Sequence, residues 1–334
     1  MSEFFSCYIY RRFFYETIGV LTSGGDAPGM NAAVRAVVRT ALAMGMNVKG
    51  VRRGYNGLIN GDIFDMGVRD VSEIIHRGGT VLYTARCLEF KTEEGVDKAV
   101  ENCKKFGIEG IVVIGGDGSY RGARDLSLKG IPCVGVPGTI DNDISSTDYT
   151  IGFDTAMNTA MEMVDKLRDT TQSHDRCSVV EVMGRNAGHL ALQTGIAVGA
   201  VAIMVPEIPC DVENVIKKIE LTRKNGKQHF IIVVAEGVEK GVGQIAKEIE
   251  EATGVESRAT ILGHVQRGGN PTVRDRVMAS YMGNAAVELL AKGVGNRVIC
   301  YDKGEILNRD IYEALQMKKP FDVDGYRVAD TISL

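Results

Sequence analysis

Short apolar runs alternate with helical stretches along almost the whole chain, and this alternation constrains the fold more than any other feature. Apolar runs with the length of a strand lie at 17–22, 47–52, 109–114, 132–136, 178–182, 201–205, 229–235 and 298–301. Stretches with helical character lie at 31–44, 94–106, 155–169, 187–198, 212–224, 243–252 and 274–292. The alternation predicts mostly parallel sheets with helices on both faces. Because strand–glycine–helix units recur in both halves, we expect two similar α/β lobes with a cleft between them.

The composition fits this class and argues against others. The 334 residues are 44% hydrophobic and 25% charged, which suits one large or two medium globular domains. The 40 glycines suit the tight turns between strands and helices that such a fold needs. The net charge of −4 gives no basic character that would indicate a nucleic acid or a membrane surface as partner. No apolar run reaches the length that spans a membrane.

The cysteines and the N-terminal residues carry two further expectations. The 7 cysteines are scattered, odd in number and free of CxxC or Cys/His clusters, so we expect reduced thiols in a cytoplasmic protein. Residues 1–16 are rich in Phe and Tyr but lack the apolar core and the cleavage site of a signal peptide. They are predicted to form a disordered or surface-packed extension.

Two acids and a hydroxyl share a tight turn at 138–143, directly after an apolar run that ends at Pro137. In an open α/β sheet, ligands bind at the carboxyl ends of strands. One carboxylate, Asp141 or Asp143, could accept a proton from a hydroxyl nucleophile, while the other could hold Mg²⁺. The alternative is a plain surface turn, because Asp and Asn favour turns through local hydrogen bonds. Taken alone, the turn leaves both interpretations open.

A second glycine-rich turn, at 115–119, follows an apolar run and precedes a stretch that can be helical from Ser119 to about Leu128. Glycines let a phosphate approach the backbone, and the N-terminus of a helix favours anions. Asp117 lies where it could take a metal ion bound to those phosphates, and Ser119 is expected at the N-cap. The turn favours phosphate binding over a simple connection.

A third turn, at 23–31, has the same form and precedes a helix with an apolar stripe. Gly24 and Gly29 have the spacing of a P-loop, but Met30 and Asn31 stand where that motif requires Lys and Ser or Thr. The later glycines Gly116, Gly118 and Gly122 also miss the spacing of a dinucleotide fingerprint. The chain is therefore neither a P-loop NTPase nor a dinucleotide-binding protein by these motifs.

Five segments then occur in a specific order: 24–31, 115–119, 137–143, 183–185 and 263–269. Together they resemble the bacterial ATP-dependent 6-phosphofructokinases, from about Thr17 to the C-terminus. The resemblance implies two Rossmann-like lobes with the active site in the cleft between them. The larger, ATP-binding lobe would comprise 17–151 and 265–315, and the smaller, fructose 6-phosphate-binding lobe would comprise 152–264 and 316–334.

The reaction implied by the resemblance is a step of glycolysis, in which the γ-phosphoryl group of MgATP passes to the 1-hydroxyl of fructose 6-phosphate. Positioning and charge neutralisation do most of the catalysis in such a transfer. By resemblance, Asp141 is the base, Thr139 and the Gly25 amide bind the moving phosphoryl group, and Arg185 and Arg86 offset its charge. The implied magnesium ligands are Asp117 and, more loosely, Asp143. The implied ATP site comprises Gly25, Arg86, Cys87, Gly116, Asp117, Gly118 and Ser119.

The implied sugar site needs fixed cations for the 6-phosphate, and Arg provides a bidentate fork. Its residues by resemblance are Thr139, Ile140, Asp141, Met183, Gly184, Arg185, Glu236, His264 and Arg267, with Arg176 and Arg258 contributed by a neighbouring subunit. Taken singly, Arg176 could be a solvated charge after a helix ending near Asp169, and His264 could be a structural residue that ends an apolar strand at 260–263. The shared site implies that a homotetramer is required for catalysis.

The resemblance also implies a regulatory site, but fewer residues of this chain match the family there. In the bacterial enzymes, a second phosphate site between subunits takes ADP or phosphoenolpyruvate, and Arg35, Arg39, Arg168 and Lys227 match its lining. Val201 stands where the family has a glutamate for the magnesium ion of ADP, and Val68, Asn225 and Gln228 replace basic residues. We therefore expect blunted activation by ADP and weak inhibition by phosphoenolpyruvate.

Three other functions compete with this one. A kinase of the NAD or lipid kinase type shares the turn at 115–118 but leaves 138–143 and 264–267 unexplained. A pyrophosphate-dependent phosphofructokinase carries bulk or charge at the positions of Gly118 and Gly138. A non-catalytic sugar-phosphate sensor would be expected to lose Asp141 or Asp117, and both are present.

Overall fold

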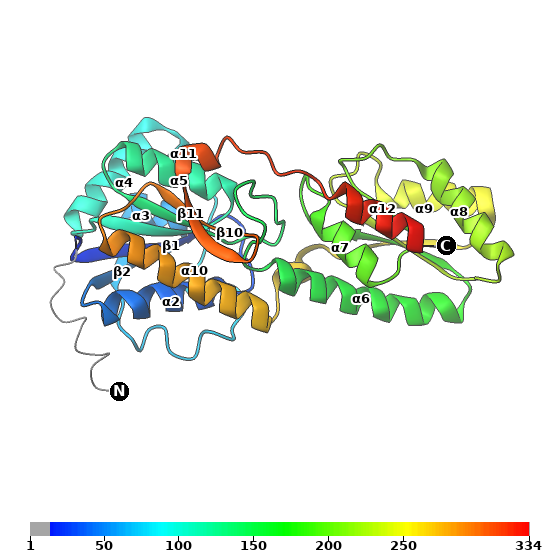
Figure 1. The fold of residues 1–334 in the computed structure, drawn as a ribbon, viewed down its shortest axis with the longest axis horizontal. Coiled ribbons are helices and arrows are strands. Elements are labelled where there is room, and N and C mark those ends of the chain that lie inside the picture. The colour runs from blue at the N-terminus through cyan, green and yellow to red at the C-terminus, as the bar shows by residue number, and fades with distance from the viewer. Residues whose placement is uncertain (1–13, 334) are drawn as a thin grey trace. The chain divides into compact units, whose positions relative to one another are not determined.

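The computed structural model describes residues 14–333, which form two compact units (Figure 1). Unit 1 comprises residues 14–139, Ile144–Gly152 and Asn270–Lys318. Unit 2 comprises Ile140–Asp143, Phe153–Gly269 and residues 319–333. The extension was predicted for residues 1–16, and its first 13 residues lie outside the described part of the chain. Each predicted strand and helix overlaps an element of its own type, and the predicted α/β class with mostly parallel sheets is confirmed.

Unit 1 is built on a seven-stranded sheet with the order β11-β10-β5-β4-β1-β2-β3. The five inner strands run parallel, and β3 and β11 add one antiparallel strand at each edge. The strands are β1 (Thr17–Ser23), β2 (Asn47–Val51), β3 (Ile63–Asp65), β4 (Gly110–Gly115), β5 (Cys133–Pro137), β10 (Arg297–Asp302) and β11 (Glu305–Asp310). The inner strands β4 and β5 are buried over their whole length, which explains why they read as continuous apolar runs.

Helices cover both faces of this sheet (Figure 1). Helices α2 (Met30–Ala43) and α10 (Val273–Ala291) lie side by side on one face. The other face is covered by α3 (Gly54–Asn60), α4 (Glu93–Lys105), α5 (Asp117–Leu128) and α11 (Ile311–Ala314). Leu58, Val100 and Leu126 from these helices pack on strand residues such as Val113 to form one buried core.

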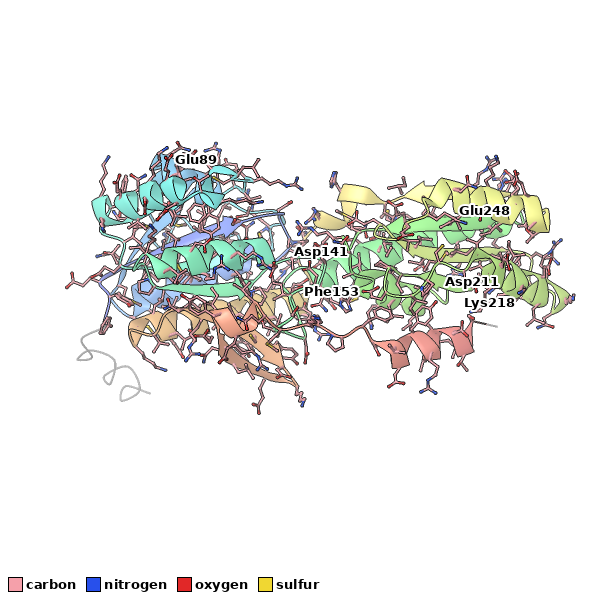
Figure 2. The ribbon with its side chains drawn as sticks, turned by 90° about the horizontal axis from the view of Figure 1, so that it is seen from above. Glu89, Asp141, Phe153, Asp211, Lys218 and Glu248 are labelled. Carbon is pink, nitrogen blue, oxygen red and sulfur yellow. The ribbon has the colours of Figure 1, made fainter. Side chains whose placement is uncertain are left out.

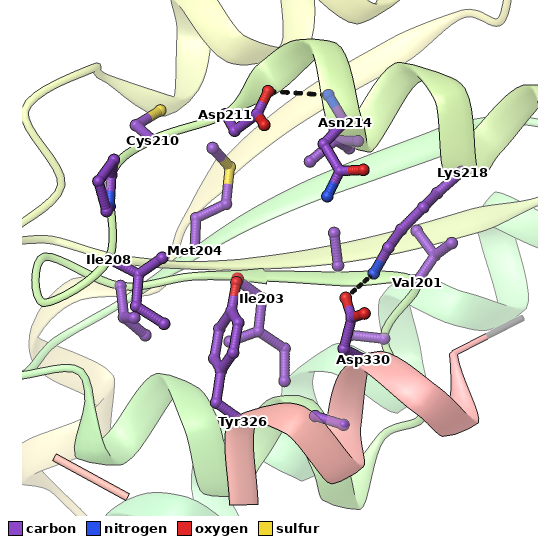
Figure 3. A pocket seen from close by; sticks show the side chains of 16 residues that line it. Val201, Ile203, Met204, Ile208, Cys210, Asp211, Asn214, Lys218, Tyr326 and Asp330 are labelled. Carbon is purple, nitrogen blue, oxygen red and sulfur yellow. Dashed lines mark hydrogen bonds and ion pairs between the residues drawn. The ribbon is translucent and has the colours of Figure 1, made fainter. Parts of the chain in front are cut away.

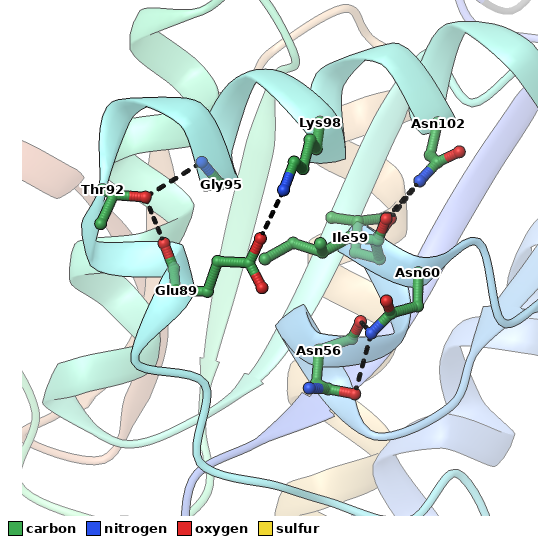
Figure 4. A network of polar contacts seen from close by, with 9 residues as sticks. Asn56, Ile59, Asn60, Glu89, Thr92, Gly95, Lys98 and Asn102 are labelled. Carbon is green, nitrogen blue, oxygen red and sulfur yellow. Dashed lines mark hydrogen bonds and ion pairs between the residues drawn. The ribbon is translucent and has the colours of Figure 1, made fainter.

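Helix α3 is an element that the sequence did not predict, because a stretch with two glycines in seven residues has a poor helix propensity. Tertiary contacts hold it instead (Figure 4). The amide of Asn102 in α4 donates hydrogen bonds to the carbonyls of Leu58 and Ile59, at 2.9 and 2.7 Å. Thr92 caps α4 by accepting from Gly95 N, and the short 3₁₀ helix η1 (Glu89–Lys91) precedes it. These contacts fix the chain just beyond Arg86 and Cys87.

Unit 2 is built on a four-stranded, all-parallel sheet with the order β7-β8-β6-β9. Its strands are β6 (Cys177–Val182), β7 (Ala202–Met204), β8 (Phe230–Ala235) and β9 (Ser257–Ile261). Its helices are α6 (Phe153–Ser173), α7 (His189–Ala197), α8 (Val212–Lys224), α9 (Val242–Thr253), the 3₁₀ helix η2 (Gly263–Arg267) and α12 (Val323–Ile332). Figure 2 labels Phe153 at the start of α6 and Lys218 within α8.

Two sequence expectations about local structure are wrong in detail. Strand β9 covers residues 257–261 rather than 260–263, because Gly263 adopts a left-handed backbone with φ of 57° that ends the extended chain. His264 therefore lies in η2 and does not end a strand. Helix α6 continues to Ser173, so Arg176 follows it by three residues and stands immediately before β6.

Candidate active site

The three turns that were predicted to bind ligands begin next to one another in unit 1. Strand β1 pairs with β4 so that Ser23 is opposite Gly115, and β4 pairs with β5 so that Gly115 is opposite Pro137. The turns that follow these residues therefore leave the same edge of the sheet. The chain continues from β1 to β2 on one side and enters β4 on the other, which makes this a topological switch point. Ligands bind at such points in open α/β sheets.

Ser119 joins two of these turns, and its place corrects a prediction. Helix α5 begins at Asp117 with Gly116 as its N-cap, so Ser119 is not the N-cap. The carbonyl of Gly116 already accepts from the backbone N–H of Ser119, which places that residue in the first turn. The buried Ser119 hydroxyl donates to the carbonyl of Ser23 at 3.0 Å and so ties the turn after β4 to the end of β1.

Asp117 lies in the first turn of α5, and its carboxylate forms an ion pair with Arg121 at 3.0 Å. The side chain is 43% exposed, so its oxygens remain accessible from solvent. A carboxylate of this kind suits Mg²⁺, which binds one or two protein carboxylates together with substrate phosphates. Within residues 14–333, no group of three or more His, Cys, Asp or Glu could hold a metal ion by itself.

Thr139 is held by a short segment later in the chain. Its backbone N–H donates to the carbonyl of Ile151 at 3.1 Å, and its carbonyl accepts from the hydroxyl of Thr150 at 2.6 Å. Gly138 and Ile151 form a parallel β-bridge. The backbone that carries the Thr139 hydroxyl is therefore fixed on both sides.

In unit 2, several of the predicted sugar-binding residues also lie at carboxyl ends of strands, whereas Arg176 precedes β6 and Arg258 lies within β9. Strand β6 leads into 183–185, and the neighbouring β8 leads into Glu236. The two segments start side by side, because Val182 at the end of β6 pairs with Ala235 at the end of β8. Glu236 accepts from the backbone N–H groups of Gly184 and Arg185, at 3.1 and 2.6 Å. Arg185 has a φ of 53°, which is unfavourable for a residue with a side chain. The carboxylate stabilises this strained turn and fixes the direction in which the Arg185 side chain leaves it.

Arg185 points back to the carboxylate of Asp141, and its Nε lies 3.5 Å from Oδ2. The Asp141 side chain is only 2% exposed, whereas that of Arg185 is 55% exposed. A buried carboxylate beside a guanidinium that reaches solvent can take up a proton from a substrate hydroxyl while the cation offsets charge nearby.

Gln266 is a site residue to which the sequence analysis gave no role. Its side chain is fully buried, and its oxygen accepts from Met183 N at 3.3 Å while its amide donates to the Gly263 carbonyl at 3.0 Å. It thus connects the turn after β6 with η2, which carries His264 and Arg267. The signal available in the sequence was an amide between His264 and Arg267, the two residues predicted for the 6-phosphate.

Arg176 and Arg258 also share a partner, Glu256, that was not predicted from the sequence. Glu256 lies 2.8 Å from Arg176 Nε and also forms an ion pair with Arg258. The hydrogen bond from Arg176 is the main reason that the pKa of Glu256 is lowered. One carboxylate therefore holds both arginines that were predicted for a neighbouring subunit's phosphate site.

The predicted effector cations lie in both units. In unit 1, burial and then the nearby Arg39 lower the pKa of Arg35. In unit 2, burial and then the nearby Arg168 lower the pKa of Lys227, and Arg168 donates to the carbonyl of Val198. In each pair, burial and the neighbouring positive charge both disfavour the charged form. Val201 is fully buried, and its apolar side chain has no oxygen that could bind a metal ion.

A cavity of about 440 Å³ lies elsewhere in unit 2, between the edge strand β7, α8 and α12 (Figure 3). Lys218 and Asp330 form an ion pair at its wall, and Tyr326 donates to the carbonyl of Ile203 at 3.1 Å. None of the predicted catalytic, ATP-binding or sugar-binding residues lines it. It is separate from the candidate site of this unit.

Residues 17–290 match the family model described as Phosphofructokinase. The chain is 57% identical over 317 residues to an ATP-dependent 6-phosphofructokinase of Clostridium botulinum (strain Loch Maree / Type A3), which covers 95% of this chain and 99% of the relative. It is 60% identical over 316 residues to ATP-dependent 6-phosphofructokinase 1 of Clostridium perfringens (strain 13 / Type A), with the same coverage.

The fold is also similar to a solved phosphofructokinase structure from Saccharomyces cerevisiae, with a TM-score of 0.86 and 36% identity over 95% of this chain. The match covers 48% of the yeast chain, so this protein spans about half of that length. Both the sequence relatives and the shared fold agree with the motifs at the carboxyl ends of the strands. The chain belongs to the phosphofructokinase family.

Proposed function

We propose that the protein is an ATP-dependent 6-phosphofructokinase of glycolysis, which converts fructose 6-phosphate and MgATP to fructose 1,6-bisphosphate and ADP. The observation that carries this proposal is the buried Asp141 carboxylate with Arg185 Nε at 3.5 Å, within a chain that is 57% identical to an enzyme of that name. Unit 1 then binds the nucleotide, and unit 2 binds the sugar phosphate.

Each proposed residue has a task in the transfer. The 1-hydroxyl oxygen of the sugar attacks the γ-phosphorus, and Asp141 accepts the proton of that hydroxyl. The bond between the γ-phosphorus and the bridging β-phosphate oxygen breaks, which releases ADP. Thr139 and the Gly25 amide hold the γ-phosphoryl oxygens, and Arg185 and Arg86 offset the charge. Asp117, and more loosely Asp143, would hold Mg²⁺, which neutralises phosphate charge when bound. His264 and Arg267 bind the 6-phosphate, and Glu236 supports the turn beside the sugar.

The phosphoryl donor is ATP rather than pyrophosphate in this proposal. A Cβ atom added at Gly118 would meet nothing within 4 Å, so the backbone there is open toward solvent. Gly116 likewise leaves room, with Thr139 Cβ at 3.8 Å from the position of an added Cβ. The open glycine turn at the end of β4 leaves space for a nucleotide's phosphates to approach the backbone.

The decisive experiment supplies fructose 6-phosphate with either ATP or pyrophosphate and measures fructose 1,6-bisphosphate. Transfer from ATP and none from pyrophosphate is expected. Transfer from pyrophosphate alone would assign the protein to the other branch of its family. No transfer from either donor, with sugar phosphate still bound, would favour the sensor instead.

The working enzyme is proposed to be a homotetramer in which Arg176 and Arg258 serve the site of a neighbour. Both arginines reach solvent in the described chain, with side chains 29% and 66% exposed. The apolar residues Val273, Val277 and Tyr281 form an exposed stripe along α10 at a spacing of four, which also suits an interface. Mass measurement in solution tests this, and a monomer with full activity would contradict it.

Regulation is proposed to be weak. The cation pairs Arg35–Arg39 and Arg168–Lys227 are retained, but Val201 cannot supply a metal ligand. Saturation curves for fructose 6-phosphate with and without ADP or phosphoenolpyruvate should nearly coincide. A large shift of the midpoint with either compound would contradict this part of the proposal.

The protein is proposed to act in the cytoplasm. The described cysteines, Cys87, Cys103, Cys133, Cys177, Cys210 and Cys300, are all free, which supports a reducing compartment. Among the helices of residues 14–333, none combines the length and apolarity that a membrane crossing requires.

A further inference from the structure

Asp275 is a fully buried carboxylate in the first turn of α10. Its Oδ1 accepts a hydrogen bond from the hydroxyl of Tyr149 at 2.5 Å and another from the backbone N–H of Gly152 at 2.7 Å. The N-cap of this helix is a different residue, Thr272, whose hydroxyl accepts from Asp275 N at 3.3 Å. Burying a charge is costly unless it is well hydrogen-bonded, and both of these hydrogen bonds come from the segment 149–152 rather than from α10.

The segment 149–152 that Asp275 holds contacts two of the phosphate-binding turns. On one side, Ile151 N donates to the Pro137 carbonyl at 2.9 Å, and Ile151 and Thr150 hold Thr139 as described above. On the other side, the segment packs directly on the turn after β1. A Cβ atom at Gly29 would lie 2.6 Å from Ile151 Cγ2, and one at Gly152 would lie 2.6 Å from Ala27 Cβ.

Helix α10 holds this segment at more than one point. The guanidinium carbon of Arg274 lies 4.7 Å from the centre of the Tyr149 ring, and the neighbouring Asp275 binds the hydroxyl of the same ring. A cation over the face and an anion at the hydroxyl leave the ring little freedom to move. Movement of Tyr149 would therefore be passed along the backbone to Ile151 and Gly152.

We propose that Asp275 is a positioning residue for phosphoryl transfer. Its hydrogen bonds to Tyr149 and Gly152 fix the position of the segment 149–152. That segment in turn fixes the distance between the Gly25 turn and Thr139. Both groups must meet the same phosphoryl group, and a misplacement of about 1 Å can cost about 10²-fold in rate. This inference rests on the proposed function, because it assigns Gly25 and Thr139 to the moving phosphoryl group.

The test compares Tyr149→Phe with Tyr326→Phe, a matched control that also loses one tyrosine hydrogen bond, to Ile203 in unit 2. We expect Tyr149→Phe to lower kcat at least about tenfold, with the KM for fructose 6-phosphate within twofold of wild type. The control should keep its kcat. Asp275→Asn retains an acceptor oxygen and should recover most of the kcat that Asp275→Ala loses.

A second measurement does not depend on activity. Amide hydrogen exchange in Tyr149→Phe should rise in peptides covering 24–31 and 137–152 and stay unchanged in peptides from Phe153–Gly269, the main part of unit 2. The proposal is overturned if the kcat of Tyr149→Phe stays within twofold of wild type. It is also overturned if amide exchange in this variant is unchanged in both peptides, 24–31 and 137–152. A wild-type protein without transfer activity would refute the proposed function, while the exchange data alone would still decide whether Tyr149 holds both turns.

Discussion

The Nε atom of Arg185 lies 3.5 Å from Oδ2 of Asp141, although 44 positions of sequence separate the two residues. Asp141 is buried and belongs to the turn after β5, whereas Arg185 reaches solvent from a strained turn after β6. The pair places a cation beside the one group that the proposed mechanism uses as a base.

Asp141→Asn should lower kcat by roughly 10²–10⁴, because an amide cannot accept the hydroxyl proton. Fructose 6-phosphate should still bind, since Arg185 and the 6-phosphate residues are unchanged. Steady-state kinetics and calorimetric titration with the sugar phosphate measure the two effects separately. A variant that keeps more than a tenth of the wild-type kcat would show that Asp141 is not the base.

Gly118→Asp should damage the use of ATP far more than the binding of sugar phosphate. The added carboxylate has space in the fold but would face the phosphates of the nucleotide, and two unit charges 4 Å apart repel by about 4 kcal/mol at an effective dielectric constant of about 20. Gly118→Ala is the matched control, because its methyl group meets nothing within 4 Å. An unchanged KM for ATP in the aspartate variant would remove Gly118 from the site.

Arg258→Ala should weaken the binding of fructose 6-phosphate by roughly tenfold or more, since a hydrogen bond to a charged group contributes about 1.5–3 kcal/mol. Glu256→Gln should have a smaller effect in the same direction, because it loosens Arg176 and Arg258 together. Mixing subunits of Arg258→Ala and Asp141→Asn should restore activity in hybrids. If the hybrids stay inactive, Arg258 does not serve a neighbouring subunit.

Gln266→Leu should raise the KM for fructose 6-phosphate several-fold while the KM for ATP stays near that of wild type. The substitution keeps the volume but leaves Met183 N and the Gly263 carbonyl without their side-chain partner, at a cost of about 1–3 kcal/mol. Part of this cost will appear as a lower melting temperature. Equal effects on both substrates would mean that Gln266 supports the fold of unit 2 rather than its sugar site.

His189 should make the folded protein less stable in acid. Burial, with Lys319 as a second cause, lowers the pKa of His189 to about 4. The unfolded chain takes up this proton near its ordinary pKa of about 6.5, so stability present above that pH is lost as the pH falls toward 4.

The loss is at most about 3 kcal/mol, since one pKa unit corresponds to about 1.36 kcal/mol. Denaturant unfolding of wild type and His189→Gln between pH 7 and pH 4 measures it, with the exposed His174→Gln as control. Wild type should lose stability more steeply than His189→Gln. Parallel curves for all three proteins would contradict the assignment.

The sequence by itself determined the order of most strands and helices in both units, although α3, β3, β11, α11 and α12 were not predicted. Buried parallel strands such as β4 are continuous apolar runs, and α2 has an apolar stripe, so local pattern and final environment agree. The glycine turns and the motif at 137–143 could also be predicted from the sequence, because each lies within a few residues of the strand that positions it.

Only the tertiary structure decided the elements and partners that local pattern does not encode. Helix α3 forms despite its glycines because Asn102 and the core of unit 1 hold it, and Ser119 turns out to bind Ser23 rather than to cap α5. The supporting groups Glu256, Gln266 and Asp275 are each an ordinary polar residue in the sequence. Their roles depend on backbone atoms and side chains that the fold brings beside them, in the case of Asp275 from 123 and 126 positions away. Such contacts depend on packing between distant segments, which single-residue propensities do not contain.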